Sequence, residues 1–414
     1  MKNKGSKCLK RTALGMVLSF ILSGQAKAAD VYITAEFKAD IANPEINTFV
    51  NTTPMSPLCS NGHVEECTQN GWWSINTGIT GFKTPDQTQI KDRGAFYIGM
   101  PATKDVTITS SHGTRHTLHL DITGGALRLN TPYPSNSGIS LSRDPLPPER
   151  CYLALNNRGY GHGTMMRMYM RHVEYYNTKS GCSSGQLPAA DGNQAYIIPS
   201  FDFIYRMRTP SPLDMVPGEY TGSVSYTIGG SVMDDFDLGE GAVTNDNIIN
   251  VHFLLKVKHA FYVRFLSPTM DAVLQPENGW KQWTDYGRLP SRLKHELSFS
   301  LSSSTNYNIR LECEHLQADG RCAMKNTDGT GNAVPFDVSV TLPGSKTIIG
   351  NRDAVNVPVT QTPTEFGTDG QFIVQRQSYL SFAVNNASDI KEMLNHPGSR
   401  YKGSVNVIFD AQLD

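Results

Sequence analysis

The chain has 414 residues, and its 37 Lys and Arg side chains nearly balance its 38 Asp and Glu side chains. At a typical domain size of ~150 residues, this length predicts two domains, or three. No segment beyond residue 28 is dense in Lys and Arg, so the composition argues against nucleic-acid binding.

Residues 1–28 have the pattern of a secretory signal peptide. Five basic residues precede position 12, an apolar run covers 13–22, and Ala26-Lys27-Ala28 fits a small-x-small cleavage site. The apolar run is shorter than the ~20 residues of a membrane-spanning helix. Removing this segment takes away six of the 37 basic residues and leaves 31 against 38 acidic ones. We therefore expect an exported, acidic protein.

Six cysteines lie beyond the predicted signal peptide, which agrees with export to an oxidising compartment. The sequence alone leaves their connectivity open, and sequential pairing is the most economical choice. A zinc site is disfavoured because no C-x-x-C motif occurs. The six predicted disulfide residues are Cys59, Cys67, Cys151, Cys182, Cys313 and Cys322.

Short stretches of alternating apolar and polar residues, bounded by Gly, Pro, Asn and Ser, predict an all-β protein built from immunoglobulin-like β-sandwiches. One short helix is predicted at 389–395, capped by Ser388. The clearest predicted strands are 31–37, 106–109, 117–122, 297–301, 336–342 and 379–384.

One phrase occurs twice in the chain, which indicates two domains that share a late structural element. Residues 217–226 and 397–407 both contain a Pro-Gly turn, a Tyr, a Gly and the start of a strand. Tyr220 and Tyr401 stand where an immunoglobulin-like fold places its tyrosine corner. The boundary is predicted at 257–260, which gives domains 29–257 and 258–414.

The two copies of this phrase continue differently. After the first copy, a Gly- and Asp-rich loop leads to Val251–Val257, a strand able to pair with the copy. After the second copy the sequence ends, with Val405, Val407 and Phe409 on one face of a strand over 403–413. The second domain is therefore expected to lack its closing strand and to accept one from another chain.

These features resemble the two-domain tip adhesins of chaperone–usher fimbriae. The resemblance covers about residues 200–414 and is carried by Tyr401-x-Gly403-x-Val405-x-Val407-x-Phe409, Cys313 with Cys322, Val334–Leu342 and Arg208–Tyr220. It implies an incomplete C-terminal pilin domain whose donor-strand groove is lined by Val405, Val407 and Phe409.

The resemblance also implies partners and a location. A periplasmic chaperone first supplies the missing strand, with Asp414 as its anchor point, and the next fimbrial subunit replaces that strand at the outer-membrane usher. The protein would travel through the periplasm to the fimbrial tip at the cell surface. Its N-terminal domain would bind a host receptor such as a glycan. A non-adhesive minor pilin that initiates or caps assembly is the alternative.

Catalytic motifs find little support in the sequence, and we expect neither an enzyme nor a cofactor. Gly181-Cys-Ser-Ser-Gly185 fits G-x-S-x-G but sits beside a predicted disulfide, and His295-Glu296 lacks the second His of a zinc peptidase. Histidines 112, 116, 119 and 162 are better explained as hydrogen-bonded surface residues than as metal ligands.

Residue chemistry alone points to a receptor surface in the N-terminal domain. In the strand over 165–173, methionines alternate with an Arg-Tyr-Arg series, which is either a solvated outer face or a surface for a saccharide or an anion. Two consecutive Trp residues follow the Cys59–Cys67 loop and face opposite sides of a strand, so at most one packs in the core and the other offers an exposed aromatic platform. The predicted contacts are Trp72, Trp73, Arg167, Tyr169 and Arg171.

Overall fold

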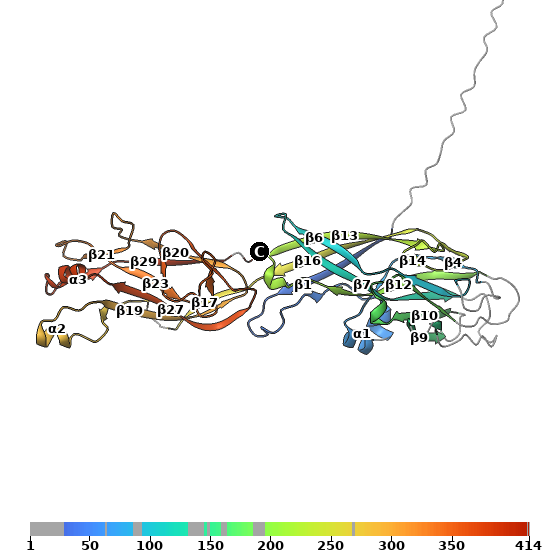
Figure 1. The fold of residues 1–414 in the computed structure, drawn as a ribbon, viewed down its shortest axis with the longest axis horizontal. Coiled ribbons are helices and arrows are strands. Elements are labelled where there is room, and N and C mark those ends of the chain that lie inside the picture. Colours follow the sequence, from blue (N-terminus) through green and yellow to red (C-terminus); the bar gives the residue numbers. More distant parts are fainter. Residues whose placement is uncertain are drawn as a thin grey trace, which may run out of the picture.

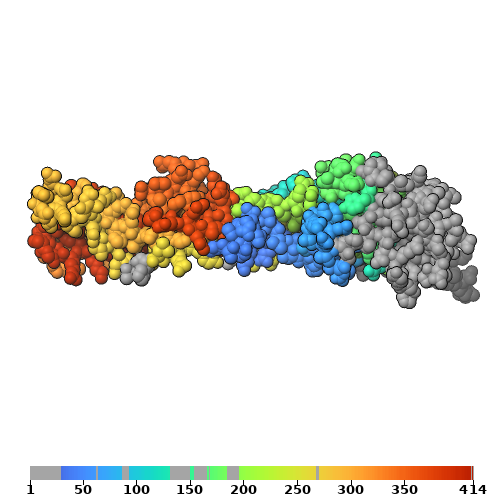
Figure 2. Space-filling view, turned by 90° about the horizontal axis from the view of Figure 1, so that it is seen from below, coloured from blue at the N-terminus to red at the C-terminus, as the bar shows by residue number. Residues whose placement is uncertain are grey.

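The computed structural model describes residues 29–62, 64–85, 93–130, 145–146, 150–158, 164–184, 195–266, 270–411 and 413. The predicted signal peptide lies outside this part of the chain. The described residues are mostly β and form two halves arranged end to end (Figures 1 and 2). No helix in the described ranges is long and apolar enough to cross a membrane.

The first half contains the elements from β1 to β16. They are β1 (Ala29–Lys38), β2 (Val50–Asn51), the π-helix η1 (Leu58–Gly62), α1 (Val64–Asn70), β3 (Trp73–Asn76), β4 (Gly81–Lys83), β5 (Tyr97–Met100), β6 (Lys104–Ser110), β7 (Arg115–Asn130), β8 (Pro145–Leu146), β9 (Cys151–Arg158), β10 (Thr164–Arg171), the 3₁₀ helix η2 (Val173–Tyr175), β11 (Ser180–Ser184), β12 (Tyr196–Arg208), the 3₁₀ helix η3 (Pro212–Asp214), β13 (Gly218–Gly229), β14 (Phe236–Asp237), β15 (Ala242–Thr244) and β16 (Ile248–Lys258).

The second half contains the elements from β17 to β29. They are β17 (Phe261–Phe265), β18 (Gln275–Pro276), α2 (Lys281–Tyr286), β19 (Leu293–Ser303), β20 (Tyr307–Cys313), β21 (Ala323–Asn326), β22 (Val334–Pro335), β23 (Asp337–Thr341), β24 (Lys346–Thr347), β25 (Val357–Val359), β26 (Thr364–Gly367), β27 (Ile373–Val384), α3 (Ala387–Leu394), β28 (Tyr401–Lys402) and β29 (Val405–Ala411).

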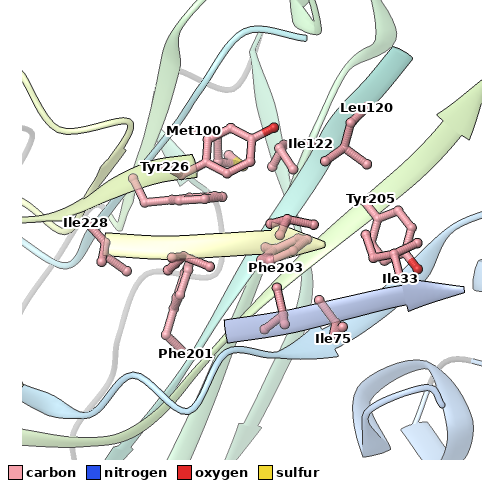
Figure 3. Packing of buried hydrophobic residues seen from close by; sticks show 14 of the residues in the cluster. Ile33, Ile75, Met100, Leu120, Ile122, Phe201, Phe203, Tyr205, Tyr226 and Ile228 are labelled. Atoms are coloured by element: carbon pink, nitrogen blue, oxygen red, sulfur yellow. The ribbon is translucent and has the colours of Figure 1, made fainter. Parts of the chain in front are cut away.

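Most strands of the first half belong to one continuous sheet, and β5, β11 and β8 form a second, smaller sheet. The main path of the continuous sheet is β15-β4-β12-β7-β6-β13-β16-β1-β2. Only two residue pairs, Tyr220 with Ser110 and Thr221 with Thr109, join β6 to β13. The ladder between β6 and β13 is therefore short. Apolar side chains from strands on both sides of it share one core, as Figure 3 shows for Ile33, Phe203 and Tyr226.

The predicted closing strand of the first half is confirmed. β16 pairs antiparallel with β13 over 218–227 and parallel with β1 along the whole of that strand. Its inward residues, among them Val251 and Leu255, are fully buried. Both long edges of β16 are therefore hydrogen-bonded, and its apolar face completes the core.

The second half is a sandwich of two main sheets, with strand orders β17-β19-β27-β23-β25 and β24-β26-β20-β29. Buried residues of both sheets, including Phe299 from the first and Ile309 from the second, belong to one core. Among the described residues, no strand of the first half pairs with a strand of the second. We propose the domain boundary after Val257, one residue before β16 ends.

The two copies of the repeated phrase have different local structures. The hydroxyl of Tyr220 donates a hydrogen bond to the carbonyl of Val216 at 2.9 Å, which makes the expected tyrosine corner. The buried hydroxyl of Tyr401 has no hydrogen-bond partner among the described residues. In the first copy, Tyr220 lies within the continuous strand β13, which pairs with β16. In the second copy, Tyr401 begins a separate two-residue strand, β28, which pairs with β21 instead.

The predicted disulfides and helix are present, with one correction. The three bridges are sequential: Cys59–Cys67, Cys151–Cys182 and Cys313–Cys322. The helix predicted at 389–395 is α3. Its N-cap is Asn386 rather than Ser388, because the Asn386 side chain accepts a hydrogen bond from the backbone N–H of Ser388 at 3.1 Å.

A buried histidine lies at the junction of the halves. The ring of His259 contacts the carbonyl of Met215 through Nε2 at 2.8 Å and the hydroxyl of Ser304 through Nδ1 at 3.0 Å. Burial lowers the pKa of His259, although the hydrogen bond to Met215 opposes this effect. Because Met215 belongs to the first half and Ser304 to the second, this one side chain ties the halves together.

Candidate functional site

The last strand of the second half has a free edge. β29 pairs with β20 along one side, from Val405 opposite Cys313 to Ala411 opposite Tyr307. No described strand pairs with its other side. Val407 and Phe409 are only half-buried, and both pack against the core of this half. An apolar strand with one unpaired edge is a template for strand addition.

The first strand of the second half has a free edge as well. Among the described strands, β17 pairs with β19 only, and its inward residues Phe261, Val263 and Phe265 are half-buried. The fully buried ring of Phe299 lies 5.3 Å from Phe265 and 5.6 Å from Phe409, measured between ring centroids. One buried ring thus contacts apolar side chains of both free strands. We call β17 and β29 with these half-buried residues the open edge.

The two halves differ at this place. In the first half, β16 lies between β1 and β13, and the inward residues of β1 (Val31, Ile33, Ala35 and Phe37) are at most 4% exposed. In the second half the corresponding strands, β17 and β29, contain no fully buried residue within their described positions. The difference is the one expected if a strand equivalent to β16 is missing. Asp414, the predicted chaperone anchor, lies outside the described residues.

Trp72, a predicted receptor contact, is buried. It belongs to a small apolar cluster with Leu58, Cys59, Cys67 and Met168, and only 8% of its surface is exposed. This cluster packs between the Cys59–Cys67 segment and the sheet. The expectation of an exposed platform at Trp72 is therefore wrong, because the disulfide-bonded segment covers it.

Tyr169 and Arg171 are also buried, so the predicted exposed Arg-Tyr-Arg series is wrong for both. Each is 1% exposed. The guanidinium of Arg171 donates hydrogen bonds to the carbonyls of Ile122 and Thr178, the latter at 2.9 Å. Burial lowers its pKa to about 10. Both faces of β10 are covered, since Met168 and Met170 on the other face join the small apolar cluster.

Of the remaining predicted receptor contacts, the structure describes only the side chain of Trp73. Trp73 is half-buried, and its indole N–H donates a hydrogen bond to the carbonyl of Thr53 at 2.8 Å. Arg167 lies in β10, but its side chain is outside the described part of the structure.

The structure brings together an exposed cluster that the sequence reasoning missed. Tyr32 on β1 is 64% exposed and stacks on His252 of β16, with ring centroids 5.1 Å apart. Asp30 contacts His252 at 3.0 Å and accepts a hydrogen bond from Asn250 at 3.2 Å. The two residues from β1 lie more than 200 positions before the two residues from β16 in the sequence. Their alternation in two strands was visible, but the parallel pairing of β1 with β16 was not.

Some of the residues considered for chemistry have structural partners, but the prediction of a hydrogen-bonded surface histidine is wrong for His116, whose buried Nε2 has no hydrogen-bond partner among the described residues. The first four residues of the G-x-S-x-G match lie in β11, where Cys182 is disulfide-bonded. His119 contacts Asp105 at 2.5 Å. His162 lies outside the described residues. Within the described ranges, no group of three or more His, Cys, Asp and Glu side chains could hold a metal ion.

No protein-family model matches the chain, and no curated protein sequence is significantly similar to it. Solved structures of fimbrial tip proteins are similar over most of its length. One is CfaE, described as the adhesive subunit of the CFA/I fimbria of enterotoxigenic Escherichia coli, with 9% identity, a TM-score of 0.27 and 92% of both chains covered. Another belongs to a CFA/I chaperone–tip adhesin complex, with 9% identity, a TM-score of 0.27 and coverage of 93% of this chain and 96% of that one.

A third is from the CsuC–CsuE chaperone–tip adhesion subunit pre-assembly complex of Acinetobacter baumannii. It has 12% identity and a TM-score of 0.22, and the match covers 93% of this chain and 99% of that one. Similarity at these identities and TM-scores is too loose to carry a functional argument. The functional argument therefore rests on the unpaired strands of the open edge.

Proposed function

We propose that the protein is a fimbrial tip adhesin whose second half, residues 258–414, accepts a β-strand from another chain. The observation that carries this proposal is the difference between the halves. The first half holds a strand between β1 and β13, while β17 and β29 each keep one edge unpaired by any described strand, beside half-buried apolar side chains. A strand added there gains main-chain hydrogen bonds and covers the open edge.

The energy available from strand addition is large enough to decide whether the second half is stable. Fully burying a Val or Phe side chain is worth roughly 1.5–3 kcal/mol. Val405, Val407 and Phe409 are already half-buried, so completing their burial contributes roughly 2–5 kcal/mol in total. A whole domain has a net stability of about 5–15 kcal/mol.

The partners follow from this proposal. A periplasmic chaperone would supply the first strand, and the next fimbrial subunit would replace it at the outer-membrane usher. Residues 29–257, which have their own closing strand, would carry receptor binding at the fimbrial tip on the cell surface. A non-adhesive minor pilin remains the alternative, because most of the predicted receptor contacts are buried.

Strand acceptance is tested by placing a carboxylate on the inward face of β29 in one variant and on its outward face in another. Phe409→Asp puts a carboxylate against the core and should abolish recovery of the chaperone complex and surface display. Asn406→Asp is the matched control, because Asn406 points outward on the same strand and is exposed. Residues 258–414 that purify as a stable monomer without a chaperone or an added strand would contradict the proposal.

Adhesion is tested with residues 29–257 on an array of host glycans. Stacking aromatics and carboxylates commonly hold sugars, so the exposed Tyr32 cluster is the surface that we propose for contact. Tyr32→Ala should weaken any glycan binding. Val173→Ala is the control within the same residues, since Val173 is 62% exposed and lies outside this cluster. Absence of binding to every glycan, cell type and matrix protein tried would favour the non-adhesive alternative.

A further inference from the structure

A cavity of about 450 Å³ lies at the end of the second half that is remote from the first half. In Figure 1, α2 and α3 both lie at this end, which we call the pole. Figure 2 shows the gold segment around α2 against the red segment around α3 there. Most of the lining residues are apolar or aromatic, among them Leu274, Trp280, Trp283, Leu293, Met393 and Tyr401, although polar and apolar atoms share the exposed lining about equally.

The cavity lies between the stretches of chain that follow β17 and precede β29. One wall comes from residues between β17 and the start of β19, and the other comes from α3, β28 and the segment between them. Leu274 on the first wall and Tyr401 on the second are half-buried against the same core as the apolar residues of the open edge. The connection after β17 also exposes large apolar side chains, with Val273 at 61%, Tyr286 at 73% and Trp280 at 38%. Exposed apolar surface of this kind marks binding sites.

The direction of a strand added at the open edge follows from the first half. There the closing strand runs parallel to β1 and antiparallel to β13. A strand placed in the same way runs antiparallel to β29. β29 begins at Val405, beside the pole, and its Asp410 lines a cavity with Asp214 and Pro217 of the first half. The added strand therefore enters at the junction of the halves, and its C-terminal end leaves at the pole.

We propose that the pole cavity binds one or two apolar side chains of the complementing chain, just after that chain leaves the ladder with β29. This inference rests on the proposed strand acceptance. Tyr401 stands four residues before Val405. Because Tyr401 lines the cavity, a short continuation of the added chain beyond Val405 would reach it. The occupant is thus a short apolar continuation of the strand that fills the open edge, and no separate ligand is needed.

Peptides test the inference on the full chain, residues 29–414, which is unfolded in denaturant and refolded in the presence of each peptide. The base peptide carries the sequence Ile248–Lys258, the chain's own closing strand, with a fluorescent label. A second peptide adds Gly-Ser-Leu-Leu at the C-terminal end, a third adds Gly-Ser-Asp-Asp there, and a fourth adds Gly-Ser-Leu-Leu at the N-terminal end. Fluorescence anisotropy measures the dissociation constant of each.

The C-terminal Leu extension should bind about tenfold more tightly than the base peptide, because it buries a Leu side chain in the cavity. The Asp extension and the N-terminal Leu extension should give no gain. Trp280→Asp should remove the gain and leave the base peptide's affinity unchanged. Val355→Asp is the control variant, since Val355 is 63% exposed and lies away from this cavity.

The possible failures are distinguishable. Equal affinity of the base and C-terminally extended peptides, or an equal gain from the N-terminal extension, would overturn the cavity inference and leave strand acceptance standing. Failure of every peptide to bind would overturn both. Circular dichroism reports whether Trp280→Asp is folded, and the comparison of Leu with Asp extensions tests the cavity without any protein variant.

Discussion

Phe409→Ala should destabilise the complex with an added strand more than it destabilises the protein without one, and should therefore weaken strand binding. The Phe409 ring is half-buried and contacts Phe299 edge-to-face at 5.6 Å. Truncating a fully buried Phe costs about 3–5 kcal/mol, and a half-buried ring should lose about half of that. The cost is therefore larger by about 2 kcal/mol once a strand covers Phe409, which corresponds to a roughly 30-fold weaker dissociation constant.

The assay is anisotropy of the labelled Ile248–Lys258 peptide on the full chain. Ile408→Ala is the matched control, because Ile408 is also half-buried on β29 but does not pack against the core. It should change the dissociation constant less than twofold. Equal losses for Phe409→Ala and Ile408→Ala would show that the peptide does not cover the inward face of β29, and the reasoning from the open edge would be refuted.

Three further predictions concern stability, measured by urea unfolding. Arg171→Met removes the donor to the buried carbonyl of Ile122 and to the part-buried carbonyl of Thr178, and should destabilise residues 29–257 by roughly 2 kcal/mol. Tyr220→Phe removes a hydrogen bond and should cost about 1 kcal/mol, whereas Tyr401→Phe should cost nothing, because its hydroxyl has no described partner. Burial lowers the pKa of His259 below 6.5, so His259 takes up a proton on unfolding at acid pH. The free energy of unfolding should therefore keep its full value above pH 6.5 and decrease as the pH falls below it. His259→Gln should abolish this decrease.

Local patterns in the sequence predicted much of the fold. Alternation placed β1, β16 and β19, and the even number of cysteines with short spacings agreed with sequential disulfides. The repeated phrase predicted that Val251–Val257 closes the first half, because a second strand of matching length follows it. These features depend on residues close together in sequence or on a pattern that the chain itself repeats.

The features that could not be predicted depend on which distant segment covers a given face. Alternation in β10 correctly separated Met168 from Tyr169, but it could not show that the Cys59–Cys67 segment covers one face and the core the other. The same limit hid the stacking of Tyr32 on His252. Long-range pairing, rather than local preference, decides whether a polar or aromatic side chain in a strand is exposed.

The direction of β29 has a mechanical consequence. The strand runs lengthwise between the pole and the junction, along the long axis of the molecule (Figure 1). A pull between a bound cell at one end and the fibre at the other would therefore load the added strand in shear, parallel to its length. The hydrogen bonds between the added strand and β29 lie perpendicular to the strands, so they share a shear load and must break together. A pull across the sheet would open them one at a time.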